Sequence, residues 1–229
     1  MLFCSFPPVF PGRMENSMNN KKRISILGDS VSTYYGLTPE GYVFYGSWNA
    51  GETGVESPED TWWMKVIRAM DGELGRNNSL SGCLVAGRAL SSGTSLNRIR
   101  DLSVNGRPDM ILVALGANDW GFSVLPEEFG TEYARMLYLL KKTYPYADIW
   151  CATLPEGRAP DDEYFFFDVD SCISKRVYSD IIRKAAAESG VHVADLYRSG
   201  QEYSSIDGVH PDKKGMQMLA DLWIRELKK

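Results

Sequence analysis

The sequence predicts an α/β fold in which a central parallel sheet lies between two layers of helices. From Arg23 onward, short apolar runs alternate with longer amphipathic stretches, which is the pattern of strands joined by crossover helices. The run MILVAL at 110–115 is apolar without interruption, as expected of a strand buried on both faces. At 229 residues, 44% of them hydrophobic and 24% charged, the chain fits one globular domain with its own core.

The expected elements follow one another in strict alternation. The first strand covers 24–27 and ends at Gly28, and a helix at 61–74 follows the start signal Pro58-Glu59-Asp60. Further strands are expected at 77–80, 110–115, 149–153 and 191–196, with helices at 126–143 and 172–189. Pro211 should open the last helix. Its core-facing positions have helical spacing: Met216, Leu219, Ala220, Trp223 and Leu227.

Residues 1–20 stand outside this alternation. They contain three prolines and an Asn-rich stretch, without a basic region followed by an unbroken apolar core, so they make a poor signal peptide. We expect a disordered leader, with Met18 as a natural start, followed by a single domain over 21–229. Since no segment approaches the length of a membrane span, we expect a cytoplasmic protein, with export from a longer precursor left open.

Charge and cysteine content limit the functions and the compartments that are compatible with this sequence. The net charge of −5, with Lys21-Lys22-Arg23 as the one basic cluster, argues against a nucleic-acid partner, which needs a clustered basic face. The four cysteines include no close C-x-x-C pair. Cys151 lies in an apolar run and is expected to be a buried free thiol, which favours a reducing compartment. Composition leaves the oligomeric state open.

Four short motifs carry the chemistry: Gly28-Asp29-Ser30, Ser81-Gly82, Gly116-Ala117-Asn118-Asp119 and Asp207-Gly208-Val209-His210. Each of the first three follows an expected strand, and the fourth lies in the loop after the last strand. Active sites of parallel α/β sheets lie beyond the carboxyl ends of the strands. We therefore expect the four motifs to meet at one edge of the sheet.

Together these motifs supply what acyl transfer requires. Ser30 offers a nucleophile, which is weak near neutral pH unless a base activates it. His210 is the expected base, because the other histidine, His192, alternates with valines in a strand. Asp207, three residues before His210, can reach Nδ1 and leave Nε2 for the serine. The alternative for Gly-Asp-Ser is a turn in which Asp29 or Ser30 caps a helix.

An oxyanion hole is expected from the backbone N–H groups of Ser30 and Gly82 and from the Asn118 amide. Gly87 or Gly93 could replace Gly82 if the loop runs differently. We also expect Asp29, Trp120 and Tyr164 to contact substrate, although Trp120 could serve packing alone. Trp62 and Trp63 are expected to pack in the core.

The four motifs resemble those of the SGNH hydrolases, the GDSL-type esterases and lipases, and the resemblance runs from about Arg23 to the C-terminus. It implies a flavodoxin-like three-layer α/β/α sandwich and hydrolysis through Ser30, His210 and Asp207. It also implies no metal and no organic cofactor, in keeping with the presence of only two distant histidines.

The substrate is predicted less sharply than the reaction. The irregular segments 36–58 and 155–171 contain Tyr42, Tyr45, Trp48, Asp161, Asp162 and Tyr164. A mixture of aromatic and acidic side chains suits an ester whose alcohol part is a polar, ring-shaped sugar. We therefore expect a short acyl group such as acetyl on a carbohydrate. The alternatives are a lysophospholipase or thioesterase acting on longer acyl chains, and a non-catalytic ligand-binding domain.

Overall fold

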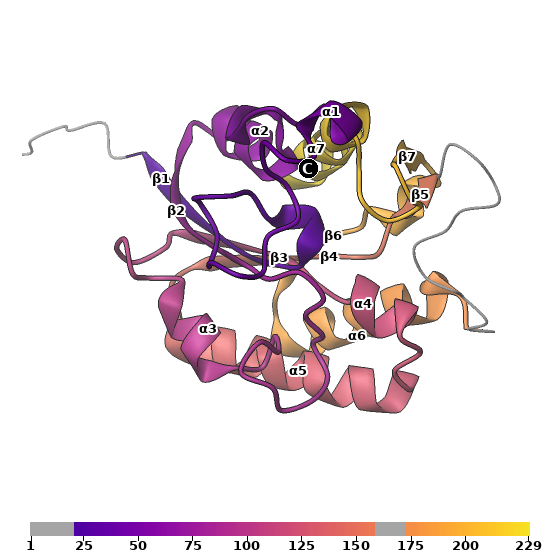
Figure 1. Ribbon diagram of the computed structural model, residues 1–229. Helices are drawn as coiled ribbons and strands as arrows, with labels where there is room; N and C mark the ends of the chain where they lie inside the picture. The colour runs from indigo at the N-terminus through magenta and orange to yellow at the C-terminus, as the bar shows by residue number, and fades with distance from the viewer. Residues whose placement is uncertain (1–20, 159–172) are drawn as a thin grey trace, which may run out of the picture.

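The computed structural model describes residues 21–158 and 173–229, which form a parallel five-stranded sheet between two helical layers (Figure 1). The strand order is β2-β1-β3-β4-β6. The strands are β1 (Lys22–Gly28), β2 (Gly72–Ser79), β3 (Met110–Ala114), β4 (Asp148–Ala152) and β6 (His192–Ala194). Central strands β1 and β3 pair in register from Ile24 with Met110 to Gly28 with Ala114. The predicted fold class is therefore confirmed.

One helical layer contains α1 (Ala50–Thr53), α2 (Trp62–Ala69) and α7 (Lys213–Leu227), above the sheet in Figure 1. The other contains α3 (Leu96–Asp101), α4 (Ala117–Gly121), α5 (Pro126–Thr143) and α6 (Lys175–Ser189). Each layer buries its own cluster of apolar side chains against the sheet. The first layer stacks Trp62 on Trp223 at 5.3 Å between ring centroids, so these tryptophans belong to the core.

Several expected elements are confirmed. Helix α5 has the predicted bounds, and β1, β3 and β4 agree with prediction to within two residues at each end. Met216, Leu219, Ala220 and Trp223 are buried under α7, and Leu227 packs against the same cluster while partly exposed. Cys151 is a buried free thiol. The expected leader at 1–20 lies outside the described residues.

Several boundaries were predicted wrongly. The helix expected at 61–74 ends at Ala69, because strand β2 already begins at Gly72 and continues to Ser79. The last strand is shorter than the expected 191–196 and covers His192–Ala194. Pro211 is not a first helical residue, since Asp212 caps α7 by accepting a hydrogen bond from the Gly215 N–H. Helix α6 begins at Lys175, three residues later than expected.

The structure adds short elements that the pattern did not predict. The 3-10 helices are η1 (Ser30–Ser32), η2 (Pro58–Asp60) and η3 (Tyr197–Ser199), and a second small sheet pairs β5 (Glu156–Arg158) with β7 (Glu202–Ser204). In the part of the chain that the structure describes, no helix has the length and apolarity needed to cross a membrane.

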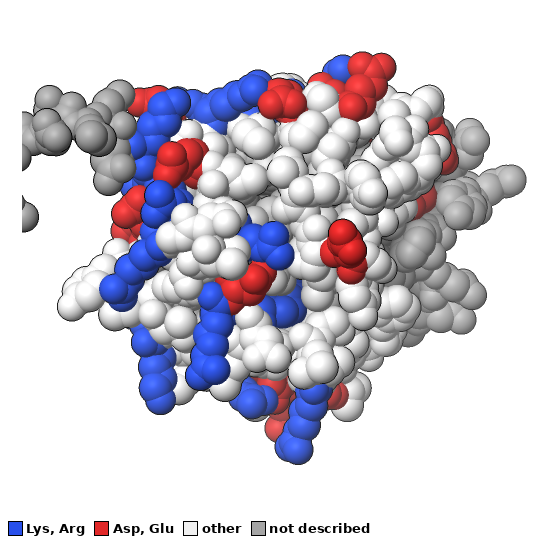
Figure 2. Space-filling view, turned by 60° about the vertical axis from the view of Figure 1, so that its left-hand side comes forward, with Lys and Arg blue, Asp and Glu red and all other residues white. Residues whose placement is uncertain are grey.

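Charged side chains of both signs share the molecular face that Figure 2 turns toward the reader. Arg23 on β1 pairs with Glu73 on β2 at 2.9 Å, and Arg76 on β2 pairs with Asp101 on α3 at 2.7 Å. Acidic partners thus accompany the basic side chains along β1 and β2.

Candidate active site

The first motif forms a tight turn at the carboxyl end of β1. Gly28 ends the strand, and Asp29 caps η1 by accepting a hydrogen bond from the Val31 N–H at 3.1 Å. A Cβ on Gly28 would lie 2.7 Å from both Ser32 and Ser79, so only glycine fits here. The cap and the buried end of the strand together fix Ser30, which is 6% exposed.

A continuous hydrogen-bond chain joins Ser30, His210 and Asp207. The distance from Ser30 Oγ to His210 Nε2 is 2.9 Å, and that from His210 Nδ1 to Asp207 Oδ2 is 2.6 Å. The backbone N–H groups of Val209 and His210 donate to Asp207 Oδ1. Gly208 has a positive φ of 81°, which allows the tight loop that brings the carboxylate back to the imidazole.

The surroundings of this chain favour a charged Asp207. Burial acts to raise the pKa of its carboxyl, but hydrogen bonds from the His210 ring and from two backbone N–H groups hold that pKa below its ordinary value. The Phe44 ring stacks on the His210 ring, with 3.7 Å between centroids and 6° between planes. Phe44 was missed at the sequence level, because nothing in its local pattern refers to a histidine 166 residues later.

The second and third motifs lie beside each other after β2 and β3. Asn118 Nδ2 donates to the Cys83 carbonyl at 2.9 Å, and the Asp119 carboxylate accepts from the N–H groups of Val85 and Ala86. These contacts tie the loop that follows Gly82 to the start of α4. Gly82 is exposed and has a φ of 71°.

The three glycines considered for the oxyanion hole differ in the structure. The Gly93 N–H donates to the Leu84 carbonyl at 2.8 Å, and a Cβ there would lie 2.9 Å from Met136 Sδ. Gly93 therefore serves packing. Gly87 is exposed, as Gly82 is, but it lies four residues beyond the Cys83 carbonyl that holds Asn118.

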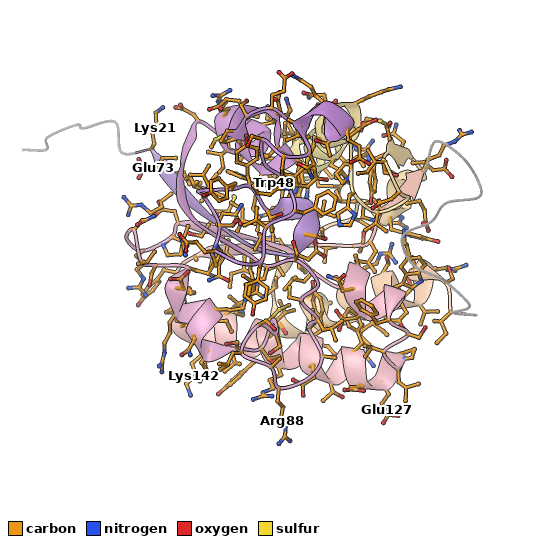
Figure 3. The ribbon with its side chains drawn as sticks, in the orientation of Figure 1. Lys21, Trp48, Glu73, Arg88, Glu127 and Lys142 are labelled. Atoms are coloured by element: carbon orange, nitrogen blue, oxygen red, sulfur yellow. The ribbon has the colours of Figure 1, made fainter. Side chains whose placement is uncertain are left out.

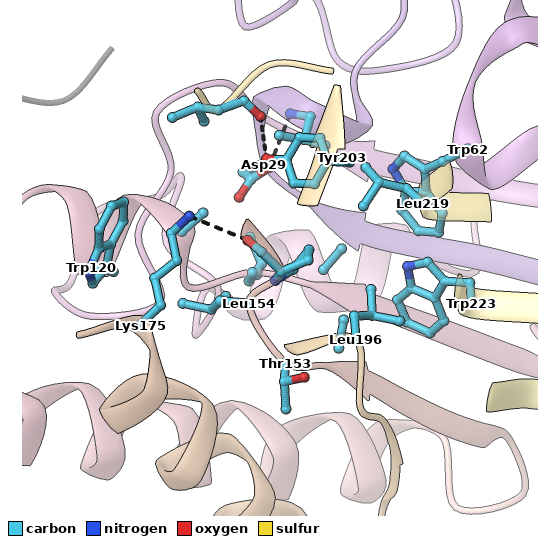
Figure 4. A pocket seen from close by; sticks show the side chains of 17 residues that line it. Asp29, Trp62, Trp120, Thr153, Leu154, Lys175, Leu196, Tyr203, Leu219 and Trp223 are labelled. Atoms are coloured by element: carbon cyan, nitrogen blue, oxygen red, sulfur yellow. Dashed lines mark hydrogen bonds between the residues drawn. The ribbon is translucent and has the colours of Figure 1, made fainter. Parts of the chain in front are cut away.

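A cavity of ≈ 70 Å³ lies at this edge of the sheet (Figure 4). Its lining includes the motif residues Asp29, Ala117 and Val209, together with Val31. Figure 4 shows Asp29, Lys175 and Trp120 toward one end and Trp62, Leu219 and Trp223 toward the other. One end is therefore polar and the other apolar.

Trp120 and Lys175 form the polar end as a packed unit. Lys175 Nζ lies 4.5 Å from the centroid of the Trp120 ring and 2.9 Å from Glu156 Oε2. Trp120 Nε1 donates to the Ile173 carbonyl. Trp120 thus both lines the cavity and packs, and Lys175 was not singled out from the sequence. Burial lowers the pKa of Lys175, while Glu156 opposes that shift.

Asp29 should make stability depend on pH. Burial raises its pKa from 3.8 to about 6, so the unfolded chain loses this proton at lower pH than the folded chain does. The free energy of unfolding therefore falls as pH rises from about 4 to about 6. Asp29→Asn removes this titration and should gain stability over the parent by roughly 3 kcal/mol at neutral pH and by little near pH 4.

Urea unfolding of the parent and of Asp29→Asn at both pH values measures this difference. The carboxamide Oδ1 of the variant can still accept from the Val31 N–H, so the cap is retained. A stability difference that stays constant with pH would contradict the assigned pKa.

The remaining residues that the sequence analysis considered do not lie together at this site. Tyr164, Asp161 and Asp162 lie outside the described residues. Tyr45 was wrongly expected in a substrate-facing segment: it is fully buried, and its hydroxyl donates to the Pro211 carbonyl. Its apolar ring fills the core beneath the loop. His192 is exposed and stacks on Trp150. It lies on β6, and none of the four motifs follows that strand directly.

No group of three or more His, Cys, Asp or Glu side chains that could hold a metal ion occurs within residues 21–158 and 173–229. Ser30, His210 and Asp207 bond to one another, and Asn118 bonds to the Cys83 carbonyl.

The fold is that of a hydrolase of the SGNH type, and the comparisons identify the family. The model of the GDSL-like lipase/acylhydrolase family matches residues 22–227, which is most of the chain. The chain therefore belongs to this family and is a carboxylic ester hydrolase. A comparison with curated proteins found no match.

Solved structures share the fold over nearly the whole length of both chains. A protein described as a GDSL-like lipase from Bacteroides uniformis is 27% identical, with a TM-score of 0.67 over 91% of this chain and 96% of that one. A carbohydrate acetylesterase from Sinorhizobium meliloti is 16% identical, with a TM-score of 0.66 over 91% and 99%. The inhibitor-bound aryl esterase of M. smegmatis is 16% identical, with a TM-score of 0.66 over 90% and 98%.

Proposed function

We propose that this protein is a serine esterase that removes a short acyl group, such as acetyl, from a carbohydrate through an acyl-enzyme. The hydrogen-bond chain from Ser30 through His210 to Asp207 carries this proposal. A buried carboxylate that fixes the imidazole through Nδ1 leaves Nε2 free to take the serine proton. Neither contact has another evident purpose in a turn on the sheet edge.

In the first step, Ser30 Oγ attacks the ester carbonyl while its proton passes to His210 Nε2. The negative charge that develops on the carbonyl oxygen is held by the N–H groups of Ser30 and Gly82 and by Asn118. His210 then gives its proton to the leaving alcohol. Water attacks the acyl-enzyme with His210 again as the base, which releases the acid and restores Ser30.

Asn118 is suited to the oxyanion because a primary amide has two N–H donors. One is used on the Cys83 carbonyl, which fixes the orientation of the amide, and the other is left for the substrate. Such a donor acts mainly in the transition state. Asn118→Ala should therefore lower kcat by roughly 10²–10³-fold and leave KM nearly unchanged.

Steady-state kinetics on a nitrophenyl ester test this, with Asn97→Ala as the control because Asn97 is exposed on α3. The control should keep the parent kcat. An increase in KM alone for Asn118→Ala would reassign Asn118 to substrate positioning.

The cavity supports a small acyl group. An engineered protein cavity of about 150 Å³ holds a benzene molecule, and this one measures ≈ 70 Å³. The side chains of Ala114 and Ala152 line it alongside larger ones. If the acyl group enters this cavity, an acetyl group fits and an eight-carbon chain does not.

Exposed aromatic side chains beside the site support a ring-shaped alcohol. Trp48, labelled in Figure 3, is 58% exposed, and Tyr35 next to it is 64% exposed. Their rings meet edge to face at 5.5 Å. Both belong to the segment that places Phe44 on His210, and a Cβ on Gly46 would collide with the Trp48 ring. Trp48 is thus an exposed aromatic surface held against Tyr35 and Gly46, four residues along the chain from the Phe44 that stacks on His210.

We expect kcat/KM to be higher for acetyl than for octanoyl esters, because a cavity of ≈ 70 Å³ is too small to take up the longer chain and so forgoes the burial of about 0.8 kcal/mol per methylene. A series of acetyl, butyryl and octanoyl nitrophenyl esters, together with acetylated sugars, measures the preference. A steady rise in kcat/KM from acetyl to octanoyl would favour the lysophospholipase or thioesterase function instead. The apolar end of the cavity at Trp62 and Trp223 is where longer chains would then extend.

A further inference from the structure

Arg98 is a buried arginine close to the nucleophile turn. It lies on α3, and only 4% of it is exposed. Its guanidinium makes four hydrogen bonds: to Asn78 Oδ1 at 2.8 Å, to the Asn78 carbonyl at 2.7 Å, to the Gly28 carbonyl at 3.0 Å and to the Ser91 carbonyl at 2.7 Å. Nearly all of its donor capacity is directed at the carboxyl edge of the sheet.

These acceptors belong to the segments that carry the proposed oxyanion donors. Gly28 lies two residues before Ser30, at the end of β1, and Asn78 lies four residues before Gly82, at the end of β2. Ser91 lies in the loop that holds the Asn118 motif through Cys83, Val85 and Ala86. A planar, rigid guanidinium therefore sets the spacing among three segments that must converge on one oxygen atom.

In the described residues Arg98 makes no direct ion pair, although its charge acts to lower the pKa that burial raises at the Asp29 carboxyl. Its four acceptors are neutral, and no carboxylate lies within ion-pair distance of it in the described residues; Asp101, on the same helix, pairs with Arg76 instead. Burying a charge without a partner is costly. A methionine or leucine would avoid that cost but would leave the acceptors on Gly28, Asn78 and Ser91 without their donor, so the arginine is explained by the segments it joins.

We infer that Arg98 is a positioning residue of the oxyanion site: its fork holds the ends of β1 and β2 at the spacing the donors require, and its positive charge favours the negative charge of the tetrahedral intermediate. The inference rests on the proposed function. An electrostatic contribution of this kind acts on the transition state more than on substrate binding, because the ester oxygen carries little charge before attack.

The test compares Arg98→Lys, which keeps the charge but loses the fork, with Arg98→Met, which loses both. Arg100→Met is the matched control, because Arg100 is exposed on the same helix. Each variant is examined by thermal melting, by ester kinetics and by inhibition with phenylboronic acid. The boronic acid takes the Ser30 oxygen onto boron, with the serine proton passing to His210, and so forms an anionic tetrahedral adduct.

We expect kcat to fall about 10-fold in Arg98→Lys and about 100-fold in Arg98→Met, since small displacements of reacting groups have effects of this size. KM should stay within about threefold, and the inhibition constant of phenylboronic acid should rise in parallel with the loss in kcat. Arg100→Met should match the parent in all three measurements.

Three results would overturn the inference: parent-like kcat in Arg98→Met, a loss of kcat without weaker boronate binding, or failure of both Arg98 variants to fold, which would assign the residue to the fold alone. Ser30→Ala, assayed alongside, separates this from the proposed function. If Ser30→Ala is inactive while the Arg98 variants match the parent, only the role of Arg98 is rejected. If Ser30→Ala remains active, the proposed function itself is rejected.

Discussion

Ser30→Ala will abolish ester hydrolysis, with kcat falling by about four to six orders of magnitude, as when a triad nucleophile is removed. The serine hydroxyl is the atom that would bond to the acyl carbon, and its described hydrogen bond is to His210 Nε2. The fold should survive, since among the described residues the hydroxyl bonds to no other element and the turn is fixed by the Asp29 cap and by Gly28. Kinetics on nitrophenyl acetate, together with a thermal melt, measure both effects.

Ser32→Ala is the control within the same turn. Its hydroxyl accepts from Trp62 Nε1 at 3.2 Å, so this variant should lose some stability and keep most of its activity. Turnover by Ser30→Ala above ~1% of the parent rate would argue for a different nucleophile, because removal of a triad serine costs far more than that.

His210→Ala should be nearly as inactive as Ser30→Ala, because the members of a triad act as a unit. Without the imidazole, the Ser30 proton has no acceptor at 2.9 Å, and the Asp207 carboxylate has no ring to orient. His192→Ala should keep most of the parent kcat, since His192 is exposed and stacks on Trp150.

The two histidine variants form a matched pair, measured on the same ester over a range of pH. Loss of activity in His192→Ala with activity retained in His210→Ala would reverse the assignment. Loss in both, with parent-like melting temperatures, would place a second histidine in the mechanism.

The layers of the fold were predictable because burial leaves a periodic signal. An unbroken apolar run predicted β3, and helical spacing predicted both α5 and the core-facing positions of α7. The candidate site was predictable to the same extent, since Ser30, Asn118 and His210 occur in short motifs placed at strand ends, where the topology brings chain-distant residues together.

The boundaries of helices and strands were less predictable where two elements, or two possible start residues, lie next to each other in the sequence. Gly72 follows α2 so closely that the helical pattern hides the start of β2. Both Pro211 and Asp212 are typical of a helix start. Asp212 is the N-cap of α7, because its carboxylate accepts a hydrogen bond from the Gly215 N–H.

Residues that act through tertiary contacts gave no signal in the sequence. Phe44 contacts His210, and Arg98 contacts Gly28 and Asn78, only once the chain has folded. For Tyr45, the sequence pattern led to the wrong expectation. Its place in an irregular aromatic segment predicted exposure, whereas its hydroxyl finds a buried acceptor at Pro211 that allows the whole ring to enter the core.

The central claim is that Ser30 is a nucleophile activated by His210. The most direct measurement is labelling of the full chain with a fluorophosphonate, followed by mass spectrometry of the modified peptide. The phosphorus should be found on Ser30 of the parent, with labelling slowed by several orders of magnitude in His210→Ala and absent in Ser30→Ala. A parent protein that stays unlabelled, or that carries the label on another residue, would contradict the claim and favour a non-catalytic ligand-binding domain or a different nucleophile.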